Sequence, residues 1–213
     1  MHGVKRGILI SFEGVEGSGK TTQAKALVDW LAAGKIPHIF VRDPGSTEIG
    51  ERVRDILLDR KNRGMHAKCE VLLFLAARSQ LAYEVLLPAL KDKKIVITDR
   101  FSDSTFAYQC YARGLPLRLI TIFNRFAAAG LKPDLTFLVD IDAAKRRERG
   151  KYIDRMETEA EGYHQKVQRG FQLMAMRAKK RYRVLDGEKS VDALHREVVN
   201  HVKEILVRKG YKI

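Results

Sequence analysis

The chain has 213 residues, 45% of them hydrophobic and 31% charged, which is enough to bury one full core, so we expect a single domain over residues 1–213. The formal net charge is +14, and half of this excess lies in residues 142–183, a segment that suits a cover over phosphates as well as a nucleic-acid groove. The apolar runs are well short of the ~20 residues of a membrane span, which argues against a membrane protein. The chain has only two cysteines, which argues against a disulfide-rich protein. Together with the lack of a signal-peptide pattern, these features indicate a cytoplasmic protein.

Short apolar or β-branched runs alternate with longer helical stretches along the chain. In chain order, the patterns predict a strand at 7–12, a helix at 20–33, a strand at 37–41, a helix through 53–58, a long helix at 67–91 bent near Pro88, a strand at 94–98, helices to about 129, a strand at 135–139, a helix at 160–180, a strand at 182–185 and a helix at 191–208. This alternation predicts an α/β fold, with a parallel sheet of about five strands flanked by helices. Ligands of such sheets bind beyond the carboxyl ends of the strands.

The first motif lies between the first predicted strand and the first predicted helix and fits the phosphate-loop pattern GxxxxGK(S/T). Backbone N–H groups and the helix N-terminus of such a loop bind oxyanions, Lys20 should reach the β and γ phosphates, and the Thr21 hydroxyl should ligate Mg²⁺. The motif predicts a P-loop NTPase. The residues expected to hold the nucleoside triphosphate are Gly14, Val15, Glu16, Gly17, Ser18, Gly19, Lys20, Thr21 and Thr22.

A carboxylate at the end of a neighbouring strand is expected to hold the water shell of the metal ion. Asp99 follows the strand predicted at 94–98, and Asp140 follows the strand predicted at 135–139. Either could instead be an ordinary helix cap or turn residue. We favour Asp99 as the metal-binding acid because Arg100 follows it.

Four short patterns bear on the group that receives the phosphate: RDPGST at 42–47, FLAAR at 74–78, DRFSDSTFAYQ at 99–109 and DRME at 154–157. Phe74 and Arg78 are one helical turn apart, so a ring that stacks on a base and a guanidinium that donates to a carbonyl share one face. Arg100, at the end of a strand, is placed to bind a phosphate with both arms of its guanidinium. Tyr108 and Gln109 add a hydroxyl and an amide that can read a sugar or a base.

With these motifs the sequence resembles the thymidylate kinases, which phosphorylate deoxythymidine monophosphate (dTMP) with ATP. The family's REPGGT turn, F-x-x-x-R helix and DR(Y/F)xxSxxAYQ segment correspond to RDPGST, FLAAR and DRFSDSTFAYQ, and the likeness runs from the glycine loop to the last helix. The resemblance implies a nucleoside monophosphate kinase-like fold, conversion of dTMP to dTDP with ATP and Mg²⁺, and a homodimer without nucleic-acid or membrane partners.

For the base, the resemblance implies that Phe74 stacks on thymine and that Arg78 contacts its O4. Ser104 and Thr105 would lie near the base edge and N3. The turn at Asp43 would border the same site.

For the sugar and phosphate, the resemblance implies that Arg100 holds the acceptor phosphate with help from Arg54. Tyr108 would crowd the 2′ position of the sugar, with Gln109 beside it, and so disfavour ribonucleotides. Glu16 corresponds to the loop acid that meets the sugar 3′-hydroxyl or the metal region.

Phosphoryl transfer requires neutralisation of charge on the migrating group, often by an arginine. One branch of the family carries that arginine in the glycine loop, but here the loop contains none. The bacterial-type branch supplies it from a lid, which the resemblance places at about 143–157. Arg146, Arg147 and Arg149 are the candidates, and the choice among them stays open.

Three departures from the family pattern stand out. Asp43 replaces the usual Glu, which shortens the reach of that carboxylate, and Ser46 replaces the second Gly of the turn. The stretch between Asp140 and Asp154 is short for the family and lacks its common Pro-Glu pair. The short stretch leaves open a catalytically weak homologue.

Two other functions remain as alternatives at this point. A kinase for another nucleoside monophosphate or for a deoxynucleoside would share the P-loop and most of the acceptor residues. A nucleic-acid-dependent ATPase would account for the charge of +14 and would show DNA binding with a steep salt dependence. The second alternative leaves the Phe74, Arg78 and 99–109 pattern unexplained.

Overall fold

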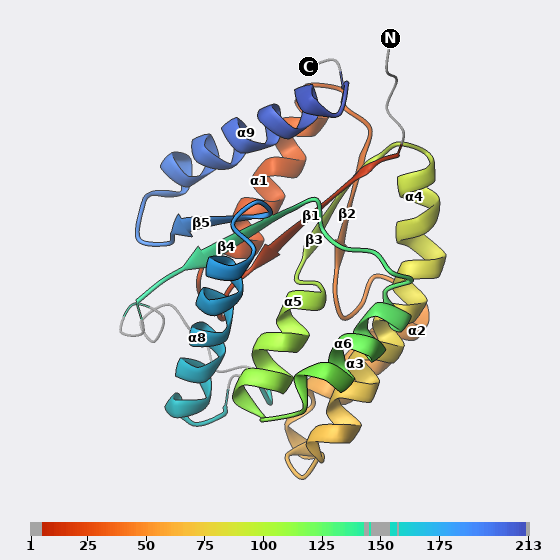
Figure 1. Ribbon diagram of the computed structural model, residues 1–213, viewed down its shortest axis with the longest axis vertical. Coiled ribbons are helices and arrows are strands. Elements are labelled where there is room, and N and C mark those ends of the chain that lie inside the picture. Colours follow the sequence, from red (N-terminus) through yellow and green to blue (C-terminus); the bar gives the residue numbers. More distant parts are fainter. Residues whose placement is uncertain (1–5, 143–144, 146–153, 157, 212–213) are drawn as a thin grey trace.

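The computed structural model describes residues 6–142, 145, 154–156 and 158–211. Five parallel strands form one sheet in the order β2-β3-β1-β4-β5 (Figure 1). The strands are β1 (Ile8–Glu13), β2 (His38–Arg42), β3 (Ile95–Asp99), β4 (Leu135–Asp140) and β5 (Tyr182–Asp186). The predicted α/β fold is confirmed, and each predicted strand overlaps an observed one.

Helices connect the strands, as the apolar periodicity predicts. They are α1 (Lys20–Ala33), α2 (Glu48–Leu58), the short turn η1 (Arg60–Asn62), α3 (Ala67–Leu81), α4 (Leu87–Lys91), α5 (Ser102–Thr105), α6 (Leu117–Ala127), α8 (Glu161–Arg177) and α9 (Val191–Arg208). Two π-helical segments, η2 (Ala82–Leu86) and η3 (Phe106–Ala112), continue α3 and α5. The interruption predicted near Pro88 is observed as η2, which ends immediately before α4.

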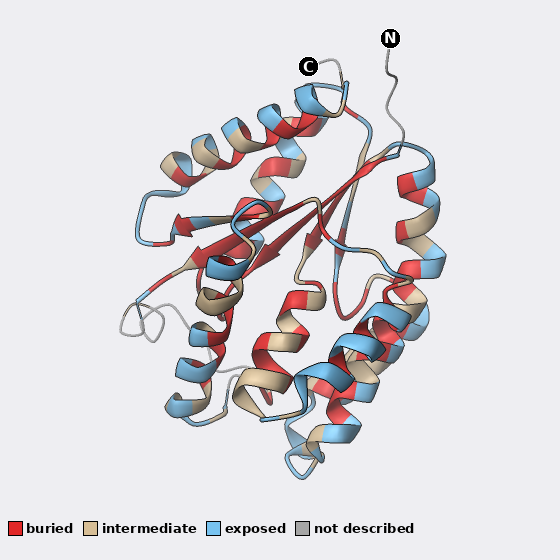
Figure 2. Ribbon diagram, viewed as in Figure 1, coloured by how far each residue is buried: buried red, intermediate tan, exposed pale blue. Residues whose placement is uncertain are grey.

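The sheet is covered on both faces because its inner strands carry apolar side chains on both sides. Ile8, Ile10 and Phe12 of β1 pack with α1 and α9 on one face. Leu9 packs with η2 and α4 on the other face, where Leu138 of β4 also packs with η3 and α8. Figure 2 shows this burial along the strands and on the inner sides of the helices.

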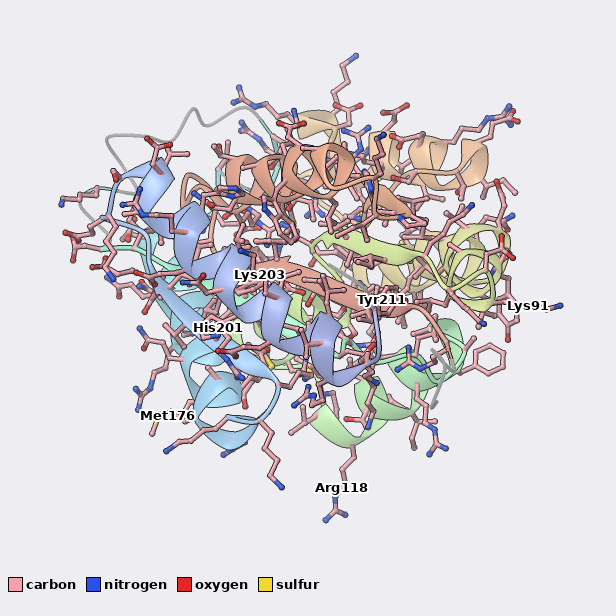
Figure 3. All side chains as sticks on the ribbon, turned by 90° about the horizontal axis from the view of Figure 1, so that it is seen from above. Lys91, Arg118, Met176, His201, Lys203 and Tyr211 are labelled. Carbon is pink, nitrogen blue, oxygen red and sulfur yellow. The ribbon has the colours of Figure 1, made fainter. Side chains whose placement is uncertain are left out.

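The closing helix α9 crosses one face of the sheet beside α1 (Figure 3). Lys203 on α9 lies over the ring of Trp30 on α1, with Nζ 5.8 Å from the ring centroid. Tyr211, just beyond α9, donates its hydroxyl to the carbonyl of Lys93 at 2.8 Å. These contacts tie the end of α9 to α1 and to the turn that precedes β3.

The helical course Ala67–Lys91 spans 25 residues and is, by length and composition alone, apolar enough to cross a membrane. The uninterrupted apolar runs of the sequence are shorter than a membrane span, so they do not indicate this 25-residue apolar helical course. Two charged residues of this course, Glu70 and Arg78, are 0% and 1% exposed and form ion pairs inside the protein. This helical course is therefore partly buried, with 39% of its most apolar stretch inside the protein.

The middle of the sheet brings the functional motifs together. β1 lies between β3 and β4, and the parallel register pairs Phe12 with both Asp99 and Phe137. Beyond the strand ends, Arg100 donates its backbone N–H to the carbonyl of Phe12 at 2.9 Å. The glycine loop after β1 and the segment after β3 are therefore direct neighbours.

Candidate active site

The glycine loop leaves β1 at Glu13 and enters α1 at Lys20. Gly14, Gly17 and Gly19 have φ of 143°, 73° and 95°, a region that favours glycine. A Cβ on Gly14 would lie 2.5 Å from the carbonyl oxygen of Val139, so a side chain there would not fit. The loop and the N-terminus of α1 thus line one groove, and a glycine loop before a helix N-terminus suits oxyanions.

Lys20 is buried at the start of α1, and its Nζ donates to the carbonyl of Val15 at 3.3 Å. Burial and the neighbouring Arg100 lower its pKa, while Asp99 and Glu16 act in the opposite direction. The ammonium is held inside the loop, next to the position expected for phosphates.

Thr21 and Asp99 form the candidate metal site. The Thr21 hydroxyl donates to Asp99 Oδ2 at 2.5 Å, and Asp99 Oδ1 is buried without a hydrogen-bond partner in the described part of the chain. One hydroxyl and one carboxylate fit Mg²⁺, which keeps several waters and binds phosphates rather than a full protein cage. Accordingly, no cluster of three or more His, Cys, Asp or Glu ligands occurs among the described residues.

Asp140, the alternative acid, is engaged elsewhere. Its two carboxylate oxygens accept hydrogen bonds from Gln168 and Gln172 of α8, at 2.8 and 3.0 Å. The structure therefore brings Asp99, and not Asp140, to the Thr21 hydroxyl.

A cavity lies beside the glycine loop. All ten residues predicted to bind the acceptor line it: Glu16, Asp43, Arg54, Phe74, Arg78, Arg100, Ser104, Thr105, Tyr108 and Gln109. Pro44, Leu58, Asp154 and Met156 complete the lining. Phe74, Arg78 and Arg100 thus border one and the same cavity.

Arg78 is held in place by hydrogen bonds to four acceptor residues. Its Nε donates to Asp43 Oδ2 at 2.6 Å, and Nη1 donates to Thr105 Oγ1 and Asn124 Oδ1, each at 2.6 Å. Nη2 donates to the carbonyl of Phe101 at 3.3 Å. Because a guanidinium has five N–H donors, one Nη2 donor is left for a ligand in the cavity.

Asp43 sits at the base of the RDPGST turn. Burial raises its pKa although Arg78 opposes this shift, and its Oδ1 is buried without a partner among the described residues. Ser46, which stands where the family has glycine, has φ of 64°, and its Oγ accepts the backbone N–H of Arg42 at 2.8 Å. The turn thus keeps a conformation that favours glycine, with a side-chain hydrogen bond as partial compensation.

Arg100 joins the loop to the cavity. Its Nη1 donates to the carbonyl of Gly14 at 2.9 Å and to Ser104 Oγ at 3.1 Å. Its Nη2 donates to Glu16 Oε1 at 2.7 Å, and its guanidinium lies 5.1 Å from the ring centroid of Tyr108. One cation therefore touches both halves of the site.

Glu16 is the acid at the centre of this arrangement. Its Oε1 also accepts the Tyr108 hydroxyl at 2.6 Å. Burial opposes its ionisation, but Arg100, Lys20 and the Tyr108 hydroxyl outweigh burial and hold its pKa at about 2. Glu16 is therefore a carboxylate at neutral pH.

A buried ionic cluster supports the far side of the cavity. Glu70 accepts hydrogen bonds from Gln109 at 3.1 Å and from Arg113 at 3.1 and 3.0 Å. Arg155 pairs with Glu70 at 2.6 Å and donates to the carbonyl of Leu57 at 2.9 Å. This cluster fixes Arg155, the neighbour of Asp154, which lines the cavity. Arg54 borders the same side and donates to the carbonyl of Pro44 at 2.9 Å.

Sequence reasoning missed three parts of the site. Glu13, fully buried, accepts the backbone N–H of Phe101 at 2.8 Å and the Ser104 hydroxyl at 2.6 Å. Leu58 and Met156 line the cavity as ordinary apolar residues, and only the DRME pattern pointed toward Met156. Residues 187–191 and Leu194 border a second groove together with the glycine loop, and no motif marks them.

The predicted lid at about 143–157 is described only in part. Arg146, Arg147 and Arg149 lie outside the described residues. Lys145 is described, and its Nζ donates to Glu188 at 2.5 Å, beside the glycine-loop groove.

Comparisons with known proteins agree on one family. A family model described as "Thymidylate kinase" matches residues 12–198. Thymidylate kinases of Pelotomaculum thermopropionicum and Caldanaerobacter subterraneus subsp. tengcongensis are 42% and 44% identical, over 94% and 98% of this chain and 95% and 100% of theirs. The crystal structure of thymidylate kinase from Ehrlichia chaffeensis is similar with a TM-score of 0.75 at 33% identity, covering 92% of this chain and 98% of that one.

Proposed function

The chain belongs to the thymidylate kinase family, and from this premise we propose that it transfers the terminal phosphate of ATP to dTMP, giving dTDP. The observation that carries the proposal is the position of Arg100, which contacts the glycine-loop carbonyl of Gly14 and also borders the cavity with Phe74 and Arg78. Transfer between two phosphates requires that both be held close together, and here one cation joins an oxyanion loop to a neighbouring cavity.

We assign reading of the base to Phe74 and Arg78. Phe74 offers an aromatic face in the cavity for stacking, and the remaining Nη2 donor of Arg78 is suited to a carbonyl oxygen such as O4 of thymine. Since Arg78 can only donate and is fixed by its partners, it disfavours the amino group that cytosine carries at the same position. Ser104 and Thr105 border the base edge.

Arg100 and Arg54 are assigned to the acceptor phosphate. Both line the cavity, and a guanidinium matches phosphate oxygens with paired donors. Tyr108, fixed by Glu16, is placed against the sugar at its 2′ position, with Gln109 beside it. A ribose hydroxyl would have to displace this buried ring, which favours deoxynucleotides.

In the transfer step, the main task of the protein is to neutralise negative charge on the phosphates. Lys20 holds the phosphates of ATP inside the loop, and Thr21 with Asp99 would hold Mg²⁺, which neutralises charge on the β and γ phosphates when bound. Arg100 fixes the accepting oxygen opposite the loop. The lid arginines Arg146, Arg147 and Arg149 remain candidates for the last positive charge.

We also propose that the enzyme is a homodimer that works in the cytoplasm without nucleic-acid or membrane partners. Exposed apolar side chains occur on the neighbouring helices α2, α3 and α6, and such surfaces commonly mark interfaces. They include Ile49, Ile56, Leu72, Ile122, Phe123 and Phe126. Both cysteines are free thiols, which suits a reducing compartment.

The direct test is product analysis by chromatography with purified protein, ATP and dTMP. We expect dTDP and ADP in equal amounts, formed with Mg²⁺ and not after chelation by EDTA. ATP hydrolysis without formation of dTDP would refute the proposed function.

A further inference from the structure

His164 is a buried histidine of α8 whose ring makes no hydrogen bond in the part of the chain that the structure describes. Its side chain is 1% exposed, and both Nδ1 and Nε2 lack a hydrogen bond. A buried polar group without a partner costs about 1–3 kcal/mol, so each such group calls for a specific explanation.

The ring lies next to an equally unusual oxygen. Nδ1 of His164 is 3.9 Å from Oε2 of Glu16, which is buried and has no partner among the described residues. The other oxygen, Oε1, is shared by Arg100 and Tyr108. A potential donor and a carboxylate oxygen are thus about 1 Å beyond hydrogen-bond distance.

Close packing of α8 against η3 places the ring there. A Cβ on Gly170 would lie 2.8 to 2.9 Å from the Tyr111 side chain, so only glycine permits this approach. Phe171 packs edge-on against Tyr108, with ring centroids 6.2 Å apart, and Val167 is fully buried. The backbone position of His164 is therefore set by the core and not by a mobile surface side chain.

We propose that His164 is a positioning residue for Glu16, donating a hydrogen bond from Nδ1 to Glu16 Oε2 when the acceptor nucleotide is bound. The carboxylate would then be fixed by Arg100, Tyr108 and His164 together. The role rests on the proposed function, because it is defined by binding of the acceptor. It also links the loop acid to α8, the first helix after the predicted lid.

Two substitutions separate positioning from packing. His164→Phe keeps the ring volume and removes the donor, whereas His164→Asn keeps a donor nitrogen near the Nδ1 position and removes volume. We expect His164→Phe to lower kcat/KM for dTMP roughly ten-fold with Tm unchanged or higher, because an unpaired polar group is lost. His164→Asn should stay within about three-fold of wild type while its Tm falls. Activity that simply follows Tm in both variants would overturn the proposal.

A double-mutant cycle with Glu16→Gln tests the partner. If His164 acts through Glu16, the variant Glu16→Gln/His164→Phe should lose no more kcat/KM for dTMP than Glu16→Gln alone, whereas additive losses would contradict the role.

Val167→Ala, on the same buried face of α8, is the control: it should lower Tm and leave kcat/KM unchanged. If the wild-type enzyme forms no dTDP, the proposed function fails; if it does and His164→Phe matches it, only the role of His164 fails.

Discussion

Arg100 combines a strained backbone with a central position in the site. Its φ of 68° lies in the left-handed region, which costs a non-glycine residue about 1–2 kcal/mol. The buried carboxyl group of Glu13 holds this turn through Phe101 and Ser104. The turn aims the guanidinium at Gly14 and Glu16, so the local strain is coupled to the function proposed for it.

Arg100→Ala should lower kcat/KM for dTMP by about 10²-fold or more, because a charge-assisted contact to the acceptor phosphate is lost. Binding of ATP, measured by calorimetry, should change little, since the loop and Lys20 remain. Arg100→Lys, which keeps the charge without the paired donors, should be intermediate. A normal kcat/KM in the alanine variant would remove Arg100 from its assigned role.

Glu13 makes the stability of the protein depend on pH. Burial, followed by the nearby Asp103, raises its pKa from 4.5 to about 8. The neutral carboxyl therefore stabilises the fold fully below about pH 4.5, and this contribution is lost as the pH rises toward about 8, because the unfolded chain releases the proton first.

Glu13→Gln, which cannot ionise, should remove this dependence. Urea unfolding should show the variant gaining stability relative to wild type between about pH 5 and about pH 8 and gaining no more above that range. A difference between the two proteins that is constant with pH would show that Glu13 does not titrate in this way.

At the scale of elements, α8 is positioned by one glycine. Gly170→Ala places a methyl group 2.8 to 2.9 Å from Tyr111, so we expect a loss of about 1–3 kcal/mol in the free energy of unfolding. Gly162, at the exposed start of the same helix, has no neighbouring atom near its Cβ position and is the control. Denaturant unfolding that shows equal stability for Gly170→Ala and Gly162→Ala would contradict this packing.

The helices and strands were largely predictable because the spacing of apolar residues and the positions of glycine and proline are local properties of the sequence. Strand ends, the glycine loop and the bend near Pro88 follow from neighbouring residues. The choice between Asp99 and Asp140 was less certain, because both follow a strand; only the tertiary packing of α8 shows that Asp140 accepts hydrogen bonds from Gln168 and Gln172. Leu58 and the segment 187–191 border the two pockets through long-range packing that no local pattern encodes.

At the scale of the whole molecule, the exposed apolar surface on α2, α3 and α6 is the feature that the sequence did not reveal. Which apolar side chains of these helices are exposed depends on tertiary packing, so it is visible only in the fold. Phe126, for example, is 79% exposed on α6, while Asn124 of the same helix is buried against Arg78.

Ile122→Glu should disrupt the proposed homodimer by placing a charge in its apolar interface. Met176→Glu is the matched control, because Met176 on α8 is 63% exposed, Ile122 is 64% exposed, and only Ile122 belongs to this surface. Light scattering after size exclusion should give the mass of one chain, 24.3 kDa, for Ile122→Glu and twice that mass for Met176→Glu and wild type. A dimer that survives Ile122→Glu would place the interface elsewhere.

The central claim is that the cavity bordered by Phe74, Arg78 and Arg100 selects a thymine deoxynucleotide as phosphate acceptor. It is tested most directly by competition, with dTMP, UMP, AMP and CMP present at equal concentrations with ATP and Mg²⁺ and the diphosphates separated by chromatography. The account predicts dTDP as the dominant product. Equal phosphorylation of the four acceptors, or preference for another one, would contradict it.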